Sequence, residues 1–114
     1  MSDEPTGVDI GGIDDIPTRG SRIIETPSTR IAIFRTVDDA IFAIEDRCPH
    51  LKGPLSQGIV HAHNVTCPLH NLVIDLETGR AQAPEGGCVT TYPVEIRDGR
   101  IFLQLRSVNP AKVA

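Results

Sequence analysis

Residues 48–70 read CPHLKGPLSQGIVHAHNVTCPLH, and this stretch decides which fold is expected for the chain. Cys48 and His50 are separated by one residue, and after sixteen further residues Cys67 and His70 are separated by two. Each pair has the short spacing by which a loop directs a thiolate and an imidazole at one point. A proline follows each cysteine, and its fixed φ near −65° stiffens the loop. The stretch predicts a metal centre held by Cys48, His50, Cys67 and His70.

Two kinds of metal centre use two cysteines and two histidines. A structural zinc site usually pairs Cys with Cys and His with His, whereas both pairs here are mixed. A [2Fe-2S] cluster with two cysteines on one iron and two histidines on the other needs one ligand to each iron from each loop. The mixed order favours the iron–sulfur cluster, and a zinc-stabilised interaction module is the alternative. A purely structural role would require two such tight pairs to arise by chance, since buried cysteines and solvated turn histidines are common.

Three other histidine and cysteine residues are present. His61 and His63 would share one face of a strand, but between Gly58 and Asn64 we expect a hairpin turn with no further ligand nearby. Cys88 is interpreted as a small apolar residue entering a strand. We assign no metal-binding role to these three.

Around this stretch, alternation of apolar and polar residues with a period of two predicts short strands. They are expected over residues 22–25, 30–37, 40–45, 65–67, 72–76, 94–97 and 100–105. Asp38-Asp39 and Asp98-Gly99 are expected turns, and Asp-Gly between two alternating runs is the strongest short-range hairpin signal. No eleven-residue window carries a helical stripe. The predicted fold class is all-β.

Length and charge narrow the possible organisation and partners. A chain of 114 residues fits one domain, here 1–114, with loose termini at 1–7 and 109–114 and a metal-binding subdomain at about 46–76. The net charge of −4 and the lack of any Lys/Arg cluster argue against nucleic acid. No apolar run approaches the roughly 18 residues of a membrane span, and the acidic N-terminus lacks a signal-peptide core. With cysteines used in metal pairs, we expect a cytoplasmic protein without a membrane partner.

The four candidate ligands match the signature of the Rieske family, C-x-H followed by a spacer of about this length and C-x2-H. The resemblance implies stacked antiparallel sheets, with two cluster loops at the tip of a small subdomain. It also implies a Rieske-type [2Fe-2S] cluster bound by Cys48, His50, Cys67 and His70.

A narrower resemblance covers most of residues 8–105. The stretches CPHLKGPLSQGIV (48–60), VTCPLHN (65–71), IDLETG (74–79) and GCVTTYPV (87–94) look like the small subunit of assimilatory NAD(P)H-dependent nitrite reductase. Rieske ferredoxins tend to have Gly after the second ligand histidine, where this chain has Asn71. One departure from the nitrite reductase branch is Leu72, where that branch often has an aromatic residue.

This resemblance implies an electron-transfer subunit that works in nitrate assimilation beside a large subunit, which reduces nitrite to ammonium. That partner would carry FAD, a [4Fe-4S] cluster and sirohaem, and this chain would supply no catalytic residues of its own. The alternative with the same carrier chemistry is a Rieske ferredoxin of a ring-hydroxylating oxygenase system, which would dock to other redox proteins.

High-potential Rieske proteins resemble this chain at the ligands but add a disulfide and two hydroxyl donors. The corresponding positions here are Gly53, Leu69, Leu72 and Ile74, which can neither form a disulfide nor donate to a sulfur. The resemblance therefore implies a potential in the lower part of the Rieske range.

Overall fold

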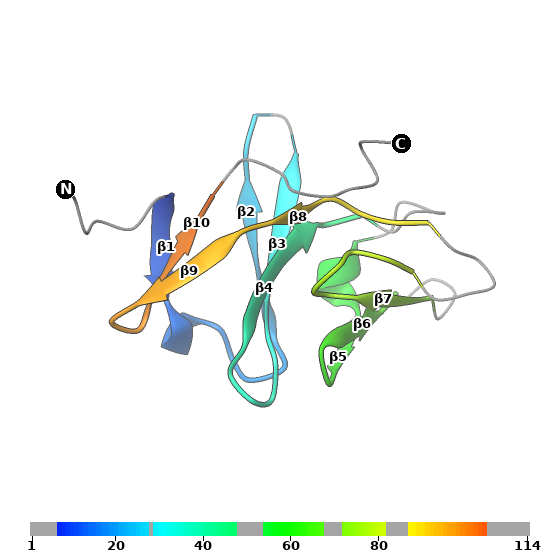
Figure 1. Ribbon diagram of the computed structural model, residues 1–114, viewed down its shortest axis with the longest axis horizontal. Helices are drawn as coiled ribbons and strands as arrows, with labels where there is room; N and C mark the ends of the chain where they lie inside the picture. Colours follow the sequence, from blue (N-terminus) through cyan, green and yellow to red (C-terminus); the bar gives the residue numbers. More distant parts are fainter. Residues whose placement is uncertain (1–6, 28, 48–53, 68–71, 82–86, 105–114) are drawn as a thin grey trace.

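The computed structural model describes residues 7–27, 29–47, 54–67, 72–81 and 87–104. In these residues the chain forms three antiparallel sheets (Figure 1). The first sheet has the order β1-β10-β9, built from Val8–Gly12, Arg100–Leu103 and Val94–Arg97. The second has the order β2-β3-β4-β8, built from Ser21–Glu25, Arg30–Arg35, Ile41–Glu45 and Thr91–Tyr92. The third has the order β5-β6-β7, built from Ile59–His61, Asn64–Thr66 and Val73–Asp75.

The helical part of the described chain consists of two 3-10 turns, η1 (Ile13–Asp15) and η2 (Leu55–Gln57). The all-β prediction is therefore confirmed. Three strands, β1, β5 and β8, were not among the predicted ones. The strands β5 and β8 are runs of three and two residues, which are too short to show a period.

The second sheet lies between the other two (Figure 1). In its strand β3, all four central residues are apolar and fully buried. Ile31 and Ile33 pack in one core with residues of β10, whereas Ala32 and Phe34 pack in another with residues of η2, β6 and β7. Successive side chains of a strand point to opposite faces, so β3 contributes to both cores. The second core is the one that supports the candidate site.

Two turns can be compared with the prediction from the sequence, and one of them begins earlier than predicted. Asp98 and Gly99, between β9 and β10, both have positive φ values of 55° and 77°, as a two-residue hairpin turn requires. The predicted strand over 30–37 ends earlier, at Arg35, because Thr36 already belongs to the following turn. There Thr36 N donates to Ala40 O at 2.9 Å.

The third sheet packs tightly against the turn that precedes it. A Cβ atom at Gly58 would lie 2.2 Å from Thr66 O, so only glycine allows η2 to approach β6 this closely. Gly58 thereby fixes the position of η2 relative to the β5–β6 hairpin.

The termini expected to be loose, 1–7 and 109–114, lie outside the described residues except for Gly7. In the described part of the chain, no helix has the length and apolar character needed to cross a membrane.

Candidate metal centre

Of the four predicted ligands, the structure describes Cys67. Cys48, His50 and His70 lie outside the described residues. The geometry of the centre can therefore be built from Cys67 and from the points where the two ligand-bearing loops leave the sheets and return to them. We call each such pair of points the neck of a loop.

The neck of the second loop is made by main chain. Cys67 directly follows β6, and its backbone N donates to Leu72 O at 2.7 Å, just before β7 begins. This hydrogen bond closes the loop that contains His70. The Cys67 residue is fully buried in the core cluster that also holds Leu72, and it is in no disulfide. Cys67 therefore stands at the closed neck of its loop, and its thiolate is the form that would bind a metal.

The neck of the first loop is made by side chains. Asp46 directly follows β4, and Ser56 lies in η2 on the far side of the segment that carries Cys48 and His50. Ser56 N donates to Asp46 Oδ1 at 2.7 Å, and Ser56 Oγ donates to Asp46 Oδ2 at 3.0 Å. The two ends of this loop are thus joined by two hydrogen bonds to one carboxylate.

Both necks belong to one packed unit. Leu55, next to Ser56 in η2, is fully buried in the same core cluster as Cys67 and Leu72. Described residues beside both loops therefore pack in one apolar core.

His63 is the second residue of the two-residue turn between β5 and β6, and His61 directly precedes that turn, which confirms the predicted hairpin. His61 ends β5, and its Nε2 lies 2.6 Å from Thr66 Oγ1. His63 Nε2 lies 3.1 Å from Asp38 Oδ2, and its Nδ1 lies 3.1 Å from Glu77 Oε2. Among the described residues, no group of three or more His, Cys, Asp or Glu side chains is arranged to hold a metal ion.

The surroundings of His63 change its acidity. Its hydrogen bond with Glu77, followed by the one with Asp38, raises the pKa of the imidazole. In return, the pKa of Asp38 is lowered, mainly by a hydrogen bond from Thr36 and then by the one with His63. His63 thus links the β3–β4 turn to the segment after β7, and the two carboxylates favour its protonated form.

Cys88 forms an isolated antiparallel bridge with Arg80 and is exposed. Two residues separate it from the short strand β8, so it does not enter that strand directly.

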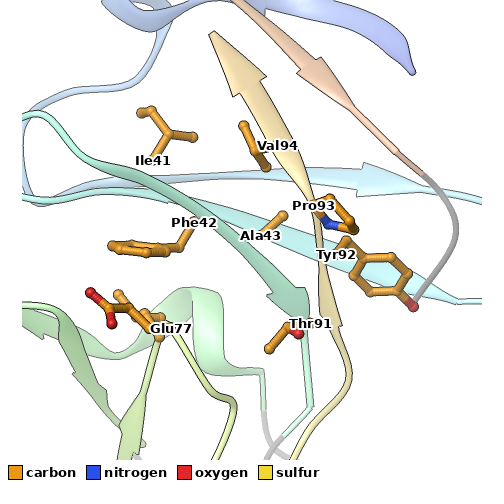
Figure 2. A pocket seen from close by; sticks show the side chains of 9 residues that line it. Ile41, Phe42, Ala43, Glu77, Thr91, Tyr92, Pro93 and Val94 are labelled. Carbon is orange, nitrogen blue, oxygen red and sulfur yellow. The ribbon is translucent and has the colours of Figure 1, made fainter. Parts of the chain in front are cut away.

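A cavity of about 260 Å³ lies between β4, the β8–β9 segment and the residues after β7 (Figure 2). Phe42, Leu76 and Val94 make much of its described lining apolar, and Glu77 is the carboxylate among those lining residues. No histidine, lysine or cysteine stands beside Glu77 in that described lining. The cavity is also smaller than the roughly 300–1,000 Å³ of most ligand pockets.

Sequence reasoning missed Asp46 and Ser56. Asp46 stands in the charged run Glu45-Asp46-Arg47, where an acidic side chain is most simply interpreted as solvated. The sequence signal that could have found it is its position, two residues before Cys48.

Comparison with known proteins places the chain in a family. The model of the Rieske-like [2Fe-2S] domain matches residues 8–104. The chain belongs to this family, and its cofactor is a Rieske-type [2Fe-2S] cluster. The prediction of an iron–sulfur cluster is therefore confirmed, and the zinc alternative is not supported.

Two relatives and one solved structure add detail. The chain is 37% identical over 94 residues to the 3-phenylpropionate/cinnamic acid dioxygenase ferredoxin subunit of Photorhabdus laumondii, covering 80% of this chain and 87% of the relative. It is also 37% identical over 93 residues to the anthranilate 1,2-dioxygenase ferredoxin subunit of Burkholderia cepacia, covering 81% and 85%. A crystal structure described as a small subunit of NADPH nitrite reductase superposes with a TM-score of 0.77 at 25% identity, covering 87% of this chain and 98% of that one.

Proposed function

We propose that this chain is the ferredoxin of a ring-hydroxylating dioxygenase system and carries electrons from a reductase to the oxygenase. The observation that carries the proposal is the 37% identity to two dioxygenase ferredoxin subunits, in each case over at least 80% of this chain. A protein of this kind needs no acid, base or nucleophile, because the cofactor performs the redox step and the protein binds and presents it.

The proposed ligands are Cys48 and Cys67 for one iron and His50 and His70 for the other. When bound, the cluster accepts and releases one electron at a time. The two necks support this assignment, because they bring both ends of each ligand-bearing loop to one buried base. Cys67 contributes its thiol from the core side of that base.

The proposal does not extend to a particular aromatic substrate. The two relatives are named for dioxygenases of different acids, 3-phenylpropionate or cinnamic acid in one case and anthranilate in the other. Both names attach to ferredoxins about equally similar to this chain. Substrate choice therefore belongs to the oxygenase.

A second candidate is the small subunit of an NAD(P)H-dependent nitrite reductase. It is supported by the solved structure at 25% identity and by Asn71, where Rieske ferredoxins tend to have Gly. The two candidates share the cluster and its proposed ligands, and they differ in the redox partner.

Co-purification separates the two candidates. The chain, tagged and expressed in its native host, should be isolated without air and its partners characterised by their absorption spectra. The proposal expects a flavin-containing reductase, an oxygenase, or both. A partner with the visible bands of sirohaem would overturn it and establish the nitrite reductase candidate.

A further inference from the structure

Asp46 is a buried carboxylate in an unusual place. It directly follows β4 and precedes Cys48 by two residues. Its side chain has no exposed surface. Aspartate is almost never fully buried unless it is paired, because removing a charge from water is costly. The hydrogen bonds of Asp46 must therefore offset a large desolvation cost, which makes their location informative.

Those hydrogen bonds join two points that are ten residues apart in the sequence. Both carboxylate oxygens accept from Ser56, one from the backbone N at 2.7 Å and one from the hydroxyl at 3.0 Å. Arg30 Nη2 lies 3.6 Å from Asp46 Oδ2, and Asp46 N donates to Arg30 O at 2.9 Å. The carboxylate is thus held on β3 and β4 while it binds η2.

Ser56 is itself anchored to the middle sheet. Its carbonyl oxygen accepts from Ser21 Oγ at 3.0 Å, so η2 is bound to β2 as well as to the end of β4. Its neighbour Leu55 is fully buried in the core. Neither end of the segment between Asp46 and Ser56 can move without breaking a hydrogen bond or exposing apolar surface.

We propose that Asp46 is a positioning residue for the cluster, because its clasp with Ser56 fixes the entry and exit of the loop that carries Cys48 and His50. This inference rests on the ligand assignment under Proposed function and is independent of the redox partner. Fixing both ends of a loop reduces the conformational freedom that the loop would lose on binding the cluster. Groups that hold metal ligands in place from outside the ligand shell affect retention of the metal strongly.

The first test measures cluster release. The rate at which an iron chelator bleaches the visible spectrum is compared between wild type, Asp46→Ala, Asp46→Asn and Ser56→Ala. We expect release from Asp46→Ala to be roughly tenfold faster or more, in line with other outer-shell substitutions. Asp46→Asn and Ser56→Ala should be intermediate, because asparagine keeps one acceptor oxygen and Ser56→Ala keeps the backbone hydrogen bond. Should Asp46→Ala fail to fold, these two variants carry the test.

A matched control separates positioning from general stability. Ile101→Ala removes a buried side chain of β10 in the other core cluster, away from both necks. It should lower the thermal stability and leave the release rate within about twofold of wild type, whereas outer-shell changes cost about tenfold or more. Equal acceleration in Ile101→Ala, or release within twofold of wild type in the Asp46 and Ser56 variants, would overturn the inference.

A spectroscopic readout completes the test. The reduced Asp46→Asn protein should show altered or broadened g-values in its electron paramagnetic resonance spectrum, because a looser loop permits several ligand geometries. A spectrum identical to wild type would count against positioning. Cys48→Ser serves as the reference for the ligand assignment. If Cys48→Ser retained its cluster, the assignment itself would be wrong, whereas cluster loss in Cys48→Ser with wild-type behaviour at Asp46 would refute the positioning role alone.

Discussion

The two loops that carry the proposed ligands are closed in different ways. The second neck is a main-chain hydrogen bond from Cys67 N to Leu72 O, which most substitutions leave in place. The first neck is a buried carboxylate bound by a serine, and it depends on the identity of both side chains. Loss of a buried partner leaves a donor or acceptor unsatisfied, which costs more than the hydrogen bond itself contributes. Outside the ligands, the first loop should therefore be the more sensitive to single substitutions.

The largest effect is expected at the ligands themselves, where both loops should fail equally. Cys48→Ser, His50→Ala, Cys67→Ser and His70→Ala should each abolish the cluster, because each removes one of the four bonds to iron. Iron and acid-labile sulfide, measured per chain, would show the loss. Iron and sulfide near two each in any of these variants would show that the residue is not a ligand.

At the second neck, Leu72→Ala should cost stability and spare the cluster. Leu72 is 5% exposed in the core, so its truncation should lower the free energy of unfolding by about 2–5 kcal/mol. Because the main-chain hydrogen bond remains, iron release should stay slower than in Asp46→Ala. Chemical denaturation and the chelator assay measure the two quantities. Faster iron release in Leu72→Ala than in Asp46→Ala would contradict the expectation that the first loop is the more sensitive to substitution.

The redox potential of the cluster depends on residues in and beside both loops. The positions that carry a disulfide and hydroxyl donors in high-potential relatives are here Gly53, Leu69, Leu72 and Ile74, and the structure shows Leu72 and Ile74 buried as apolar core residues. With fewer donors to stabilise the reduced cluster, the midpoint should lie in the lower part of the Rieske range of about −150 to +300 mV. Protein-film voltammetry at pH 7 measures it. A midpoint above about +100 mV, in the upper part of that range, would contradict the prediction.

The smallest effect is expected at His63, which lies at the opposite end of β6 from Cys67. Glu77 and Asp38 raise its pKa above the unfolded value of about 6.5, so the folded state binds the proton more tightly than the unfolded state. The stability gained is complete below that unfolded value and is lost as the pH rises through the folded pKa. His63→Ala should therefore lower the thermal midpoint most at acid pH, and the difference from wild type should shrink toward alkaline pH.

Thermal unfolding of wild type and His63→Ala across this pH window provides the measurement. All three groups are partly exposed, so added salt should reduce the difference. A difference that grows with pH would contradict the assignment. The visible spectrum of the cluster should be the same in both proteins, because His63 is not a proposed ligand.

Much of the fold could be predicted from the sequence, because local signals agreed with the final structure. The Asp98-Gly99 turn and the alternating runs beside it identified the β9–β10 hairpin, and the mixed Cys/His pairs identified the cofactor. The His61–His63 turn was also expected, since a hairpin fits between Gly58 and Asn64.

What could not be predicted depends on contacts between distant residues. Apart from its position near Cys48, nothing local marks Asp46 as buried, because its partners Ser56 and Arg30 reach it from η2 and β3. The link between His63 and Asp38 likewise joins residues 25 positions apart. The contribution of β3 to two separate cores also requires packing information that no single strand carries.

The most direct test of the account is electron transfer to an oxygenase. The reduced chain is mixed rapidly, without air, with the oxidised terminal oxygenase of its host, and the visible absorption of both proteins is followed over time. The account predicts that this chain is reoxidised as the oxygenase is reduced, and that Cys48→Ser supports no transfer. Failure of the fully loaded, reduced chain to reduce the oxygenase, together with transfer to a sirohaem-containing nitrite reductase, would contradict it.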